Sequence, residues 1–136
     1  RARAGTRRSP LWPGGGVVFG PRPRDFGKKV GKRTKTLALR KALSERVRAG
    51  DVVVLDALEF PKPQTKSFVA VLQALELVGT VLVVQAGGDE NLLLSARNVP
   101  GVEITTGDTL NTYQVLRYDK VVFTRAALEQ VEQRLQ

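Results

Sequence analysis

The sequence contains no cysteine, no histidine and no methionine. Without cysteine there can be no disulfide and no thiol nucleophile, and without either cysteine or histidine the zinc sites built from these residues are excluded. The absence of histidine also removes the serine–histidine dyad of many hydrolases. Most of the common routes to nucleophilic and zinc catalysis are therefore closed to these 136 residues.

Long apolar runs are also missing. No segment approaches the ~20 apolar residues that a membrane-spanning helix needs. The arginines near the N-terminus are not followed by the apolar stretch of a secretory signal. The apolar fraction of 42% is still typical of a globular protein whose length allows a real hydrophobic core. We expect no membrane partner.

Acidic residues are scarce in the first third of the chain. From Arg1 to Arg48 there are 15 lysines and arginines but only two acids, Asp25 and Glu45, which gives a net charge of +13. The rest of the chain has 7 basic and 11 acidic residues, a net charge of −4, so that the total is +9. This asymmetry predicts a polyanionic partner for the first region. Nucleic acid is favoured over a membrane surface because the region lacks an amphipathic, leucine-rich pattern.

The first stretch, RARAGTRRSPLWPGGGVVFGPRPRDFGKK, combines these charges with many glycines and prolines. Such a composition cannot form a packed core by itself. We predict an extended basic segment over residues 1–33, which becomes ordered on its partner, and a globular domain over residues 34–136.

The basic side chains of this region are the candidate phosphate contacts, because arginine and lysine neutralise phosphates and release counterions. Trp12 and Phe19 lie among them and could stack on unpaired bases, which favours RNA over duplex DNA. For Trp12 two roles stay open, stacking on a base or packing on the protein. The candidate cations are Arg1, Arg3, Arg7, Arg8, Arg22, Arg24, Lys28, Lys29, Lys32, Arg33 and Lys35, with Arg40 and Lys41 on the outer face of the next helix.

After residue 34, predicted helices and strands alternate. Apolar runs predict strands at 52–55, 80–85, 102–105 and 120–123, the first covered on both faces and the third at a sheet edge. Helical periodicity predicts helices before, between and after them. The first helix should end at Gly50 and bury Leu39, Ala42, Leu43 and Val47. The second helix should run from about Thr65 to Gly79. The last helix should begin at Thr124 and bury Leu128, Val131 and Leu135. Strict alternation predicts an α/β three-layer sandwich with a mainly parallel, Rossmann-like sheet.

One stretch of this domain suggests a nucleotide site. Gly87 and Gly88 follow a predicted strand, where open α/β sheets bind ligands. Neither glycine-rich phosphate-binding motif is present, however, and Asp89 and Glu90 would repel phosphate. We favour a turn followed by a helix with Asp89 as its N-cap. An α/β enzyme or binding module for a nucleotide or other anionic ligand is the alternative function; a duplex-DNA binder is a lesser one, since no helix-turn-helix is evident.

Several stretches together resemble a known family. RARAGTRRSPLWPGGGVVFGPRPRDF follows the pattern GxGRARxGxxRSPxWxGGGxxFGPxPRD of the universal large-subunit ribosomal protein four family in its bacterial form. LALRKALSERV, DENLLLSARNVPGV and LNTYQVLRYDKVVFT are similar to its C-terminal part. The resemblance covers essentially the whole chain.

The resemblance implies a non-catalytic, cofactor-free structural constituent of the large ribosomal subunit in the cytoplasm. Its expected partners are large-subunit ribosomal RNA (rRNA) and neighbouring large-subunit proteins, without homo-oligomers. In the family, a long loop reaches the peptide exit tunnel, and some bacterial members repress their own operon. Since family members begin with a further strand and helix, we expect the chain to be a fragment that starts within this loop. Matching the motif adds Gly14, Gly15 and Gly16 to the expected rRNA contacts, beside Trp12 and the arginines.

Overall fold

The computed structural model describes residue 3 and residues 5–136. Five helices and four strands alternate along this part of the chain. Their order is α1 (Lys32–Ala49), β1 (Val52–Leu55), α2 (Thr65–Ala74), β2 (Val81–Gln85), α3 (Glu90–Ala96), β3 (Val102–Thr106), α4 (Thr112–Arg117), β4 (Lys120–Thr124) and α5 (Arg125–Leu135). The alternation predicted from the sequence is confirmed.

The four strands form one parallel sheet in the order β1-β4-β2-β3. Val81 of β2 lies beside Lys120 of β4 on one side and Val102 of β3 on the other. The two central strands are almost fully buried because helices cover both of their faces. The predicted edge position of β3 is confirmed.

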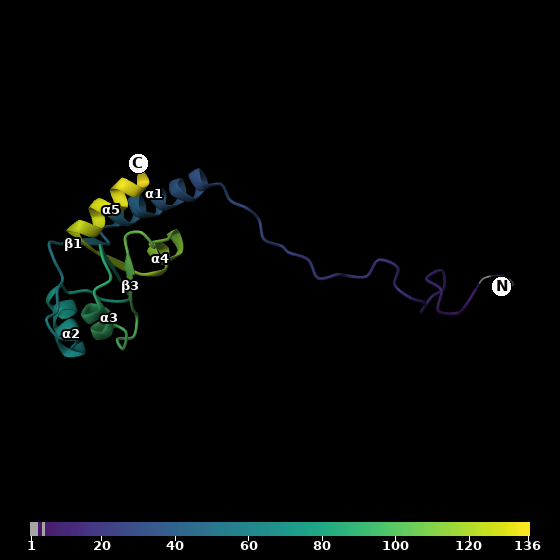
Figure 1. The fold of residues 1–136 in the computed structure, drawn as a ribbon, viewed down its shortest axis with the longest axis horizontal. Helices are drawn as coiled ribbons and strands as arrows, with labels where there is room; N and C mark the ends of the chain where they lie inside the picture. The colour runs from purple at the N-terminus through teal and green to yellow at the C-terminus, as the bar shows by residue number, and fades with distance from the viewer. Residues whose placement is uncertain (1–2, 4) are drawn as a thin grey trace.

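Side chains of the central strands point alternately into two cores, which explains the three layers. Leu82 and Val84 face α1, α4 and α5, whereas Val81 and Val83 face α2 and α3. Phe123 of β4 packs in the first core and Val122 in the second. Figure 1 shows α1 and α5 along one side of the sheet and α2 and α3 on the other. The predicted α/β three-layer sandwich is confirmed.

The ends of the helices follow local capping rules. Gly50 ends α1 in the left-handed conformation (φ 72°), and the backbone N–H groups of Gly50 and Asp51 donate to Val47 and Arg46. This pattern favours glycine because a Cβ is strained there. Asp89 accepts from the backbone of Asn91 at the start of α3, as predicted, and Thr124 accepts from Ala127 at the start of α5.

Some local predictions were wrong. β1 was predicted to be covered on both faces; Val52 packs against one core and Val53 and Leu55 against the other, but the strand lies at a sheet edge and Val54 is 50% exposed, so the cover is incomplete. Helix α2 ends at Ala74 rather than near Gly79, because the chain turns at Glu76 (φ 52°). Val47 is exposed, since this end of α1 meets α4 through the side chain of Arg46.

Residues 5–31, which we call the N-terminal segment, contain no helix or strand. Figure 1 shows this segment leaving the start of α1 and running away from the α/β domain. The first helix begins at Lys32, so Lys32 and Arg33 belong to its first turn. The division of the chain at residue 33 stays a prediction. Within the described residues, no helix has both the length and the apolar character needed to cross a membrane.

Candidate nucleic-acid interface

The N-terminal segment begins with a tight turn over residues 6–16. The backbone N–H of Ser9 donates to Thr6, that of Trp12 to Ser9, and that of Gly15 to Trp12, over 2.9–3.1 Å. The N–H of Gly16 donates to the carbonyl of Arg8 at 2.9 Å and closes the turn. The glycines predicted as RNA contacts therefore also shape the segment itself.

Trp12 lies in this turn and is half-buried there. The end of the segment that contains the turn lies away from the α/β domain (Figure 1). The sequence left two roles open for Trp12. The structure does not show one of them, packing on the α/β domain beneath the base of the segment. Stacking on a base stays a prediction.

The cations of the segment point to solvent. The predicted cations of the segment are all exposed, namely Arg7, Arg8, Arg22, Arg24, Lys28 and Lys29, and so is Arg3 ahead of it. Arg1 lies outside the described residues. Asp25 is the segment's one acid, and it accepts from the backbone N–H of Gly27 at 2.7 Å. Over the described part of the chain, no ion pair neutralises any cation of the segment.

Two aromatic rings and two arginines surround a hollow in the middle of the segment. The guanidinium of Arg24 lies over the ring of Phe26, 4.2 Å from its centre. Phe19 and Arg22 line the same open hollow of 620 Å³, and both aromatic rings are largely exposed. Phe26 was not predicted as a contact; its position two residues after Arg24 was the available signal. Exposed rings beside guanidinium groups can stack on bases while the cations bind phosphates.

The fold brings a second group of cations together around the N-terminal half of α1. Lys32, Arg33 and Arg40 line a groove of 740 Å³ with Arg134 at the end of α5. The Arg40 guanidinium donates to the carbonyl of Leu135, and Arg134 donates to Gly107 and Leu110 at 3.0 and 2.9 Å. Lys35 and Lys41 are exposed but do not line this groove. Arg134 was not predicted, because its neighbourhood depends on how α5 packs against α1.

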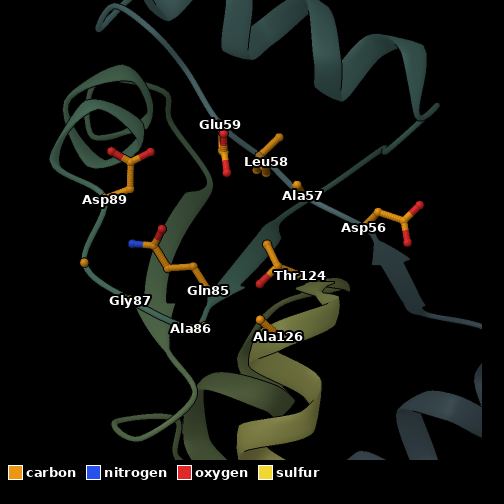
Figure 2. Close-up of a pocket in the computed structure, with 11 residues that line it drawn as sticks. Asp56, Ala57, Leu58, Glu59, Gln85, Ala86, Gly87, Asp89, Thr124 and Ala126 are labelled. Atoms are coloured by element: carbon orange, nitrogen blue, oxygen red, sulfur yellow. The ribbon is translucent and has the colours of Figure 1, made fainter.

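Acidic rather than basic side chains gather where the strands end. Figure 2 shows a cavity at the carboxyl ends of β1, β2 and β4, with Asp56, Glu59 and Asp89 around it and Gln85 directed into it. This is where nucleotides bind to many open α/β sheets. Gly87 and Gly88 leave the backbone open to solvent, but the cavity lining contains acids and no lysine or arginine. The geometry does not fit a phosphate site.

Asp51 has a structural role. Its carboxylate accepts from Lys120 at 2.7 Å and from Arg46 at 3.1 Å, and these bonds hold the pKa of Asp51 below its ordinary value. Arg46 also donates to the carbonyls of Val115 and Leu116 at 3.0 and 2.9 Å. Asp56 lies at the other end of β1 and meets Arg125 at 3.7 Å. The two aspartates therefore lie at opposite ends of β1 and do not share a site.

A sequence model described as the ribosomal protein L4/L1 family matches residues 1–134. The chain belongs to this family. The resemblance described from its motifs is thereby confirmed.

Curated relatives in the family carry the name large ribosomal subunit protein uL4. The chain is 48% identical to that of Moorella thermoacetica and 46% identical to that of Carboxydothermus hydrogenoformans, with 98% of the chain covered in both cases. It is 45% identical to that of Nitratidesulfovibrio vulgaris over 99% of the chain. The chain spans 64–65% of the length of these relatives.

Proposed function

We propose that this chain acts as a structural constituent of the large ribosomal subunit, binding large-subunit rRNA through its N-terminal segment and the start of α1. It would take part in subunit assembly, contribute to the wall of the peptide exit tunnel and meet neighbouring large-subunit proteins, as a single copy in the cytoplasmic ribosome. No catalytic role is proposed. The observation that carries the proposal is a basic segment whose cations are exposed and form no ion pair within the described residues, in a chain whose relatives are named large ribosomal subunit protein uL4.

Electrostatics support the N-terminal segment as the main RNA contact. Its cations have no acidic partners among the described residues, so their mutual repulsion is relieved only by an external anion or by salt. Phosphates spaced along an RNA backbone supply that anion, and release of counterions adds free energy. An extended segment can follow an irregular RNA surface because it has no core of its own to preserve.

Stacking on bases would complement the phosphate contacts. Phe19 and Phe26 are 92% and 72% exposed, so both rings keep apolar area that stacking on a base would bury. Arg22 and Arg24 line the same hollow and can bind the phosphates on either side of a stacked base. The hollow thus supports single-stranded or looped RNA rather than duplex DNA.

The start of α1 would extend the same surface. Its first turn has no acid and no side-chain cap, yet it carries Lys32, Arg33 and Lys35. Cations are unfavourable at the positive end of a helix. A phosphate placed there would accept from free backbone N–H groups and from these side chains, so an RNA ligand removes the conflict.

The test uses the full chain and transcribed large-subunit rRNA. Replacing Arg7, Arg8, Arg22 and Arg24 together by alanine should weaken binding and lower the slope of log affinity against log salt by about 3, since each lost phosphate contact removes about 0.7–0.9. The matched control replaces four exposed cations of the domain, Lys62, Lys66, Arg97 and Arg117. Unchanged affinity and slope in the first variant, or equal losses in both, would contradict the assignment.

A further inference from the structure

Two adjoining cavities form one crevice along the carboxyl ends of the strands, which we call the carboxyl-edge crevice. The first, of 440 Å³, is bordered by Asp56, Glu59 and Asp89, and the second, of 520 Å³, by Glu90 and residues of β3. Gln85, Gly88 and Asp89 line both. Among the described residues, no basic side chain lines either cavity, although Arg125 meets the exposed carboxylate of Asp56 at 3.7 Å. In a chain with a net charge of +9, this makes the crevice a locally acidic surface.

The side chain of Gln85 is a second and independent indication that the crevice binds a ligand. The residue is only 7% exposed, and its side chain points into the crevice (Figure 2). Over the described residues, no hydrogen bond joins its amide group to the protein, and its amide atoms are not sealed from the crevice. Amide atoms that reach an open crevice are hydrated in the free protein. A ligand that displaces this water must supply a donor for the Gln85 oxygen and an acceptor for its nitrogen.

The wall that carries Glu59 is held in place by hydrogen bonds to α3. The side-chain amide of Asn91 donates to the carbonyl of Phe60 at 3.1 Å, and the backbone N–H of Gln64 donates to the hydroxyl of Ser95 at 3.0 Å. On the other side, Asp89 is fixed by the bond from the backbone N–H of Asn91 at 2.9 Å. The crevice therefore has preformed walls.

The chemistry of the lining restricts the occupant. Phosphate groups are repelled by the acids, so RNA and nucleotides do not fit. Among the described residues, no three acids lie close enough to hold a metal ion, so the negative charges are spread along the crevice. Charges arranged in this way match an extended peptide with several cationic side chains.

We propose that the carboxyl-edge crevice binds an extended, arginine-rich segment of another protein, with one guanidinium group donating to the Gln85 oxygen and to a neighbouring carboxylate. A guanidinium suits this place because its planar set of donors can reach two acceptors at once. The Gln85 nitrogen then donates to a carbonyl of the incoming peptide. Peptide binding in the crevice does not depend on RNA binding by the N-terminal segment, and its test contains no RNA. Failure of one proposal therefore leaves the other unaffected.

The test measures binding of a fluorescent dodecapeptide of alternating arginine and glycine to the full chain by anisotropy. Glu59→Lys should weaken binding about tenfold or more, because it reverses a charge at an exposed position that the core does not need. Gln85→Met keeps the size of the buried side chain and removes its amide, and it should weaken binding about threefold to tenfold. The control, Glu132→Lys, makes the same charge change on α5 outside both cavities and should change affinity less than about twofold.

A lysine–glycine peptide of the same length should bind more weakly than the arginine peptide, since an ammonium group does not bridge the two acceptors. Thermal unfolding of each variant shows whether the fold is kept. If Gln85→Met unfolds, the comparison of peptide affinity between Glu59→Lys and Glu132→Lys still tests the proposal. Absence of peptide binding, or equal losses in Glu59→Lys and Glu132→Lys, would overturn the proposal. Equal binding of the lysine peptide would overturn the assigned guanidinium contact.

Discussion

Gly15 lies where the turn of the N-terminal segment passes closest to itself. A Cβ added at this position would lie 1.9 Å from the carbonyl oxygen of Ser9, a backbone atom that cannot move aside without opening the turn. The sequence motif suggests that glycines here allow RNA to approach the backbone. At Gly15 the structure shows that the close neighbour is the chain itself, so this glycine shapes the surface that RNA would meet.

We predict that Gly15→Ala opens the turn and weakens rRNA binding about fivefold, which corresponds to about 1 kcal/mol, while the melting temperature of the domain stays unchanged because the segment contributes nothing to either core. Filter binding and calorimetry measure the two quantities. Gly20→Ala is the control, since the atom nearest to its added Cβ is a side-chain carbon of Val17 at 3.6 Å. Equal affinity of both variants would contradict the role given to Gly15.

At the scale of elements, α1 combines a well-packed apolar face with a first turn whose charges are unfavourable. Its apolar side chains, Leu39 and Ala42, are buried in the core below α4 and α5. Its first turn carries cations where the helix dipole favours anions, without a side-chain cap. These cations lower the stability of the free helix, and we expect a negatively charged ligand to offset that cost.

Arg33→Glu should therefore change stability and binding in opposite directions. Removing a cation and adding an anion at the start of α1 should raise the free energy of unfolding by about 1 kcal/mol, the sum of two dipole effects, and should weaken rRNA binding. Urea unfolding and RNA titration measure the two effects. Lys62→Glu makes the same charge change in a linker and should leave stability nearly unchanged; a loss of stability in Arg33→Glu would contradict the argument.

At the scale of the whole molecule, a few carboxylates connect elements that are distant in the sequence. Asp51 joins Arg46 of α1 to Lys120 of β4, and Asp119 accepts from the backbone N–H and the hydroxyl of Thr80 at 2.9 and 2.8 Å. Glu103 of β3 accepts from Tyr118 and from Gln114 of α4. In each case these hydrogen bonds hold the pKa of the carboxylate below its ordinary value.

These lowered pKa values predict acid sensitivity. A group whose pKa is lower in the folded state stabilises the fold above its unfolded pKa, here near the ordinary values of 3.8 and 4.5, and loses this effect as the pH falls through the folded pKa. The melting temperature should therefore be flat from about pH 7 to 5 and fall steeply below about pH 4. Asp51→Asn should lower it at neutral pH and reduce the later fall. Asp56→Asn is the control, because that side chain is 95% exposed; the same pH profile in Asp51→Asn as in the unmodified chain would contradict the assignment.

Much of the fold was predictable because it depends on local patterns. Runs such as Val81–Gln85 indicate buried strands, and capping residues such as Asp89 and Thr124 indicate where helices begin. The errors lie where a neighbour decides the outcome. Val54 belongs to an apolar run like that of β2, but it is half-exposed because its strand lies at the edge of the sheet.

For the candidate RNA interface too, the sequence predicted one part and packing decided the other. Sequence was sufficient for the basic segment, since charge and the lack of a core are properties of composition. Arg134 joins Lys32 and Arg33 only through the packing of α5 against α1, and Arg46 was not identified as a contact of α4 because its acceptors lie about 70 residues later. Phe26 sits within the predicted segment, but its pairing with Arg24 is a matter of geometry.

The sequence by itself determined that the chain alternates helices and strands, that its first part is strongly basic and poor in core-forming residues, and to which family it belongs. These follow from composition, periodicity and motifs, each of which is local along the chain. Only the tertiary structure decided the strand order, the groove between α1 and α5, and the acidic crevice around Gln85. Their residues are brought together by packing between segments far apart in the chain, and no local pattern encodes such distances.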